Sequence, residues 1–175
     1  MPQLHSLELL PDDAGAHAVR RSWQALHDAG LPSMLDHTGA SNTPHVTVIA
    51  VPSISADDER LAVDLLGPLL PIPAALSGLA VFGAEQVTLV RVVDVPDEVV
   101  AAVLRLRGAT RGHLHPGWLP HATLGRRIPR ARLQEAVDAV GTTDAPFTLG
   151  GLRRWDPSRD AIRPLTGEDS SDDGS

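Results

Sequence analysis

Apolar and polar positions alternate along the first half of the chain at spacings typical of strands and then of helices. A β-branched run, HVTVIAV, lies between prolines, which is a strand signal bounded by breakers. Leucines repeat at helical intervals after Ser55, and Asp58 three residues later completes a capping-box pattern. The predicted elements are a strand at 3–10, a helix at 11–29, a strand at 45–51 and a helix that begins after Ser55.

The second half repeats these patterns. Two extended segments are joined by a hairpin at Gly83-Ala84-Glu85, and a helix begins at Asp97 and ends between Gly108 and Gly112. A loop rich in histidine, proline and glycine separates this helix from the next strand. The predicted elements are strands at 73–83 and 86–93, a helix from 97, a strand at 121–125, a helix at 130–140 and strands at 146–154 and 160–165.

Two similar hexapeptides occupy matching places in these halves. PHVTVI covers residues 44–49 and PHATLG covers residues 120–125, so that the motifs lie 76 residues apart. Repetition of a whole unit predicts two lobes related by a pseudo-twofold axis, with equivalent residues facing each other across a cleft. We expect an α+β fold in which antiparallel sheets carry flanking helices. Residues 1–165 are expected to form this single bilobal domain, and residues 166–175, TGEDSSDDGS, a disordered acidic tail.

The composition of the chain excludes several classes of catalytic and metal site. The chain has no cysteine and all 15 of its basic residues are arginine, which excludes thiolate nucleophiles, cysteine metal sites and a Schiff-base lysine. A net charge of −7 argues against a long nucleic-acid footprint, although the second half is richer in arginine and can meet an anion locally. No leader or membrane-spanning run is recognisable, so we expect a cytoplasmic monomer without membrane contact.

The two His-x-Thr motifs carry the candidate catalytic groups. Residues i and i+2 of a strand point to the same face, so His45 projects with Thr47 and His121 projects with Thr123. Two imidazoles on either side of phosphorus suit in-line displacement, because one takes a proton from the attacking oxygen and the other donates one to the leaving oxygen. The threonine hydroxyls can donate hydrogen bonds to the nonbridging oxygens. This scheme requires neither a metal nor another cofactor.

These features resemble the 2H phosphoesterase superfamily, which includes bacterial 2′-5′ RNA ligases and RNA 2′,3′-cyclic phosphodiesterases. The resemblance covers roughly residues 3–165 and rests on the paired motifs, their spacing and the N-terminal HSLELLPDD followed by a helix ending in Ala-Gly-Leu-Pro. It implies a bilobal fold with His45, Thr47, His121 and Thr123 in a central cleft. It also implies metal-independent reaction on 2′,3′-cyclic phosphates or 2′-5′ phosphodiesters, so that the partner is an RNA terminus or a small nucleotide.

Three residues near the second motif are candidates for substrate binding. Arg126 and Arg127 follow it directly, where a guanidinium can reach a phosphate bidentately. A regular strand would put Arg127 on the face of His121 and Thr123. Trp118 is expected either to stack on a base or to anchor the packing of a lobe. Phe82 and Trp155 have weaker claims to line the cleft.

Two other interpretations stay open from the sequence. His113 and His115 could join His121 in a three-histidine metal site of a hydrolase, against the simpler interpretation of surface histidines in a Gly- and Pro-rich loop. The chain could also be a noncatalytic module that binds RNA ends or nucleotides. Turnover separates this module from an enzyme, and sensitivity to EDTA separates the two enzymes.

Overall fold

The computed structural model describes residues 3–166 and confirms the α+β class with antiparallel pairing. Its elements follow the predicted order closely. The helices are α1 (Asp13–Asp28), α2 (Ala56–Leu66), α3 (Asp97–Ala109) and α4 (Leu133–Val140). The strands are β1 (His5–Pro11), β2 (Val46–Val51), β3 (Ile72–Phe82), β4 (Gln86–Asp94), β5 (His121–Pro129), β6 (Ala145–Asp156) and β7 (Ala161–Pro164).

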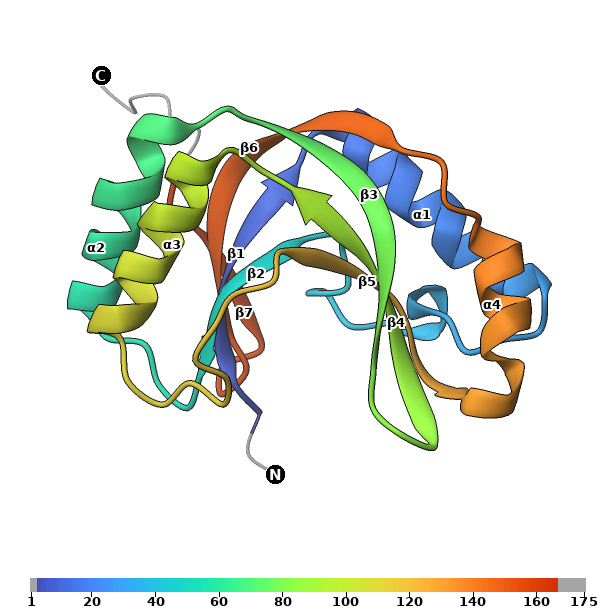
Figure 1. Cartoon of the computed structure of the whole chain (residues 1–175). Helices are drawn as coiled ribbons and strands as arrows, with labels where there is room; N and C mark the ends of the chain where they lie inside the picture. Colours follow the sequence, from blue (N-terminus) through green and yellow to red (C-terminus); the bar gives the residue numbers. More distant parts are fainter. Residues whose placement is uncertain (1–2, 167–175) are drawn as a thin grey trace, which may run out of the picture.

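The strands form one continuous sheet that is bent into an arch (Figure 1). Its order is β2-β1-β6-β3-β4-β5, with β7 added to β6. Strands β3 and β6 pair only through residues 72–76 and 145–149, and β6 then continues along β1 while β3 continues along β4. The two predicted lobes are therefore the two arms of a single sheet, joined where β3 meets β6.

Each arm takes one helix from each half of the chain. Helix α1 packs on α4 and on β5, whereas α2 packs on α3. Figure 1 shows the two helix pairs on the outer sides of the arch, one pair at each arm. Because α1 comes from the first half and β5 from the second, the arms are interlocked, and side chains of one half can position the motif strand of the other.

Local sequence signals account for where the helices begin. Asp12 precedes α1, and its carboxylate accepts a hydrogen bond from Gly15 N at 2.8 Å. The predicted capping box of α2 is confirmed, because Ser55 and Asp58 bond each other's backbone N–H groups. Within residues 3–166 no helix combines the length and the apolar character that a bilayer crossing needs.

Thr166, the first residue of the predicted tail, is the last residue that the structure describes. Its hydroxyl accepts a hydrogen bond from Leu152 N at 2.9 Å. Its own backbone N–H donates to Leu152 O. The remainder of the predicted acidic tail, 167–175, lies outside the described residues.

Candidate active site

The two His-x-Thr segments lie at the two edges of the sheet. Strands β2 and β5 are the first and last in the strand order, and the curvature of the sheet brings them close to each other. The residues between the motif positions, including Val46 and Ala122, are buried in the core. The alternation of a strand therefore directs the histidines and threonines of both edges towards the concave side.

Both imidazoles are held in the same way. His45 Nδ1 lies 2.7 Å from Thr43 O, and His121 Nδ1 lies 2.6 Å from Leu119 O. A carbonyl oxygen only accepts, so Nδ1 carries the proton in each ring and a neutral ring presents the lone pair of Nε2. Each Nε2 is thus the atom that can exchange a proton with a substrate.

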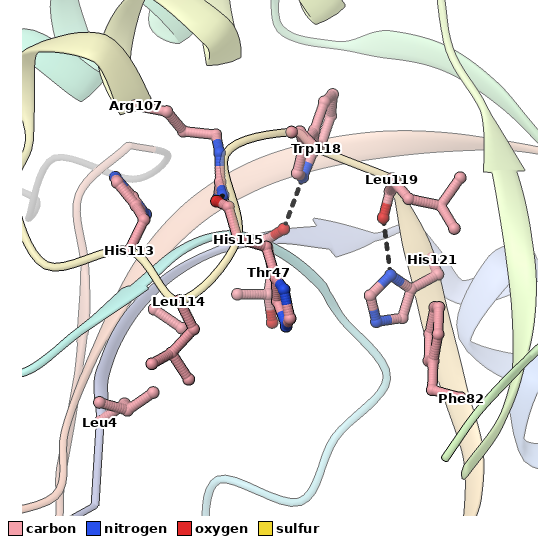
Figure 2. Close-up of a pocket in the computed structure, with 12 residues that line it drawn as sticks. Leu4, Thr47, Phe82, Arg107, His113, Leu114, His115, Trp118, Leu119 and His121 are labelled. Atoms are coloured by element: carbon pink, nitrogen blue, oxygen red, sulfur yellow. Dashed lines mark hydrogen bonds between the residues drawn. The ribbon is translucent and has the colours of Figure 1, made fainter. Parts of the chain in front are cut away.

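Two cavities meet between the motif strands and form one cleft. The first, of about 690 Å³, we name the apolar cavity, and Figure 2 shows His121 and Thr47 on facing sides of it. The second, of about 720 Å³, we name the polar cavity. The apolar cavity is lined mainly by Leu4, Phe82, Leu114, Trp118, Leu119 and His121. The polar cavity is lined mainly by Ser6, Glu8, Ser41, Asn42, His45 and Arg126.

Thr47 lines both cavities, whereas Thr123 is half-buried on β5 and lines neither. The backbone carbonyl of each threonine accepts an indole N–H bond of 2.9 Å, Thr47 from Trp118 and Thr123 from Trp23. Trp23 lies on α1, so this bond joins the two halves of the chain. Trp118 therefore lines the apolar cavity and is also hydrogen-bonded to β2, and its stacking on a base stays a prediction.

The arginines after the second motif are separated by a β-bulge. Gly125 and Ile128 are three positions apart on β5, but their partners on β4, Leu89 and Val87, are two positions apart, so β5 holds one extra residue. Arg127, within this bulge, has φ +59°. Arg126 lines the polar cavity, and Arg127 does not line either cavity. The expectation that Arg127 shares the face of His121 depended on a regular strand, and the bulge removes that condition.

The surroundings of His121 favour its neutral form. Burial lowers the pKa of His121, and positive charge on His45 and Arg126 lowers it further, while the bond to Leu119 O acts in the opposite direction. Phe82 contacts the imidazole edge-on, with ring centroids 5.4 Å apart. His121 is thus suited to accept a proton near neutral pH.

The surroundings of His45 differ in charge. Glu8 on β1 places Oε1 3.5 Å from His45 Nε2, and this carboxylate is almost completely buried. Arg153 on β6 binds the other oxygen, Glu8 Oε2, at 2.7 Å. The same guanidinium also donates to the hydroxyl of Thr43 at 2.7 Å. Glu8 therefore contacts the His45 ring, and Arg153 binds Thr43, whose carbonyl accepts the Nδ1–H of that ring.

The model of the 2′-5′ RNA ligase superfamily matches residues 11–161. The chain belongs to this superfamily. Its fold matches those of 2H phosphoesterases, and membership supports phosphoesterase activity in general terms. No curated protein sequence matches the chain.

Several solved structures share the fold at low sequence identity. A crystal structure described as a phosphoesterase has a TM-score of 0.52 and 18% identity, with 94% of this chain and 96% of that chain covered. Escherichia coli LigT complexed with 3′-AMP gives 0.51 and 18%, with 94% and 95% covered. Kluyveromyces marxianus Usb1 gives 0.51 and 13%, with 93% and 97% covered.

The three-histidine metal site is not assembled in this superfamily member. Among residues 3–166 no group of three or more His, Asp or Glu side chains is arranged to hold a metal ion. His113 and His115 do line the apolar cavity together with His121. Burial and the nearby Arg107 lower the pKa of His113. The structure thus shows these three histidines as lining residues of one cavity.

Sequence reasoning missed two charged residues of the cleft. Glu8 was not singled out, although alternation with buried Leu7 and Leu9 places it on the opposite face of β1. Arg107 on α3 was also missed, and it donates to Val48 O at 3.1 Å and to His115 O at 2.7 Å, so that it ties the 110–120 loop to β2. Helical periodicity gives no sign of this contact, because it depends on the packing of α3 near β2.

Proposed function

We propose that this protein is a metal-independent phosphodiesterase acting on 2′,3′-cyclic phosphate or 2′-5′ phosphodiester bonds of RNA ends or nucleotides. His45 and His121 are the acid–base pair, and Thr47 and Arg126, which line the cleft, bind the phosphoryl group. Thr123 is half-buried and lines neither cavity, and its assignment as the second hydroxyl donor rests on the motif. The observation that carries the proposal is that both motif histidines donate Nδ1–H to the carbonyl two residues earlier. This leaves both Nε2 atoms for proton transfer.

The two histidines have different roles in this proposal. Neutral His121 takes a proton from the attacking water at Nε2, which suits a ring whose burial lowers its pKa. Protonated His45 donates from Nε2 to the leaving oxygen as the P–O bond breaks. Threonine hydroxyls and the Arg126 guanidinium stabilise charge on the nonbridging oxygens.

The cleft also offers a place for the rest of the substrate. A planar apolar surface such as Trp118 can stack on a nucleobase, and the apolar cavity presents Trp118 and Phe82 beside His121. The structure of E. coli LigT complexed with 3′-AMP belongs to a protein of the same fold, which is consistent with a nucleotide as substrate. A cytoplasmic location and a monomeric state remain predictions from the sequence.

The decisive experiment measures turnover in EDTA of three substrates: nucleoside 2′,3′-cyclic phosphates, an oligoribonucleotide with a 2′,3′-cyclic phosphate end, and a 2′-5′ dinucleotide. We expect wild type to turn over at least one of them. His45→Ala and His121→Ala should each lower the rate by about 10² to 10⁴, the usual scale of acid–base catalysis. Thr47→Val and Thr123→Val should each cost about 10- to 10³-fold, by analogy with the loss of one oxyanion donor.

Three results would contradict this proposal in different ways. Near-normal turnover by either histidine variant would refute the mechanism. Loss of activity in EDTA with rescue by zinc would favour a metal-dependent hydrolase. Tight binding of a substrate by wild type without turnover would favour the noncatalytic binding module.

A further inference from the structure

A single acidic side chain lines the cleft. Among the described residues around the apolar and polar cavities, Glu8 is the only carboxylate. Burying a carboxylate beside a site for an anionic phosphate is costly unless the charge is compensated or used. The contacts of Glu8 indicate what it does there.

Glu8 is fixed in position on both of its oxygens. Oε1 accepts a 2.6 Å hydrogen bond from the Ser6 hydroxyl, and Oε2 accepts the 2.7 Å bond from Arg153. Both Glu8 and Arg153 are about 95% buried, since their exposed fractions are 4% and 5%. A carboxylate held in this way has a fixed direction towards His45.

The sheet register brings Glu8 to the first motif. Glu8 on β1 is the cross-strand partner of Thr47 on β2, after a bulge between Leu7 and Glu8. Glu8 Oε1 therefore lies 3.5 Å from His45 Nε2. This separation is longer than a normal hydrogen bond, so the carboxylate stabilises positive charge on the ring without holding its Nε2 proton tightly.

The other ionisable groups near His45 do not stabilise positive charge on its ring. His121 and Arg126 face it from β5, and His37 lines the same cavity from the loop before β2. Arg153 lies behind Glu8 on β6 and is neutralised by it. Among the described charged groups of this cleft, Glu8 is thus the one whose charge favours a protonated His45.

We propose that Glu8 is a positioning residue that keeps His45 protonated, making His45 the general acid and placing the leaving oxygen of the substrate in the polar cavity. This inference rests on the proposed phosphodiesterase function. In the reaction, water attacks phosphorus and its proton passes to His121 Nε2. The P–O bond to the leaving group breaks, and the proton of His45 Nε2 passes to that oxygen. The next turnover needs His45 to regain its proton, and the negative charge of Glu8 favours this step.

The test compares pH profiles of kcat for wild type and Glu8→Gln. The alkaline limb should move to lower pH by about one unit, since an opposite charge within 4–6 Å has an effect of this size. At pH 8 kcat should fall about tenfold, with a smaller loss at lower pH. A purely structural role would lower kcat by the same factor at every pH, with no movement of the limb, and this result would overturn the inference.

Two further variants keep the test valid if Glu8→Gln is unstable. Glu8→Gln combined with Arg153→Gln removes both buried charges, so no charge is left uncompensated, and it should show the same displaced limb. Glu59→Gln is the matched control, because Glu59 on α2 is also mostly buried and binds two arginines, Arg154 on β6 and Arg163 on β7, but lines neither cavity. We expect Glu59→Gln to lose stability without moving the limb.

A titration of His45 without substrate tests this inference independently of the proposed function. Proton NMR can follow the His45 ring, identified by comparison with His45→Gln. We expect the ring to release its proton at lower pH in Glu8→Gln than in wild type. If no substrate is turned over but this difference is seen, the proposed function fails and the pairing of Glu8 with His45 stands. If the two titrations coincide, the inference fails whatever the activity.

Discussion

Gly125, which follows the second motif, is a position where one methyl group should disrupt both stability and activity. A Cβ built there would lie 2.4 Å from Pro32 O and 3.1 Å from side-chain atoms of Leu26 and Ile128. The nearest atom belongs to the backbone, so it cannot move aside as a flexible side chain would. Gly125→Ala must therefore push β5 away from the segment that follows α1.

The size of the effect follows from this crowding. Overpacking a well-packed site costs about 1–3 kcal/mol, and the contact with a backbone atom places Gly125→Ala at about 2 kcal/mol or more. For a chain of this size each kcal/mol lowers Tm by about 2–4 °C, so we expect a fall of about 4–8 °C. Arg126 is the next residue, and a displacement of about 1 Å can cost up to 10² in rate, so kcat/KM should fall at least about tenfold.

Gly150→Ala is the matched control on β6, since no atom lies within 4 Å of its added Cβ. It should change the free energy of unfolding by no more than about 1 kcal/mol and leave kcat/KM unchanged. Differential scanning calorimetry and initial rates measure both effects. Equal Tm values for the two variants would show that β5 is not held at Gly125, and the argument from close approach would then be wrong.

Two other predictions concern the motif histidines and their supports. The acid limb of the kcat/KM profile reports loss of the neutral base as the pH falls. Because burial lowers the pKa of His121, we expect this limb below pH 6.5, the ordinary value for histidine. A limb above pH 6.5 would contradict the assignment of His121 as base. Trp118→Phe and Trp23→Phe each remove one indole bond to a motif threonine carbonyl, so each should cost about 1–3 kcal/mol in chemical denaturation and also lower kcat. A loss of stability without any loss of kcat would show that these bonds do not position the motifs.

The duplicated architecture was predictable because it rests on local signals. Strand periodicity placed His45 with Thr47 and His121 with Thr123, and the 76-residue spacing predicted the two arms. Alternation alone, however, cannot reveal an extra residue in a strand. The bulge before Ile128 is set by the pairing of β5 with β4, so the sequence could not show that, of the two candidates, Arg126 lines the cleft and Arg127 does not.

The position of Glu8 was unpredictable for a related reason. Its two decisive neighbours are His45 and Arg153, which lie 37 and 145 residues away along the chain. They meet Glu8 only because β1 pairs with β2 on one side and with β6 on the other. A lone glutamate between leucines in a strand signals only that one face is polar.

Duplication by itself would give two histidines with equal environments, which is unsuitable for acid–base catalysis. A pair of histidines that shares one proton has two arrangements, and only one of them has the base neutral and the acid protonated for a given direction of reaction.

The strand register shows how the two arms of this chain differ. Glu8 is the cross-strand partner of Thr47, and the matching partner of Thr123 on β4 is Val90. A carboxylate at one position and a buried aliphatic side chain at its pseudo-symmetric counterpart give the two imidazoles unequal charge environments. The fold therefore supplies the symmetric pair, and under the proposed mechanism a difference at one strand position directs the proton from water to His121 and from His45 to the leaving group.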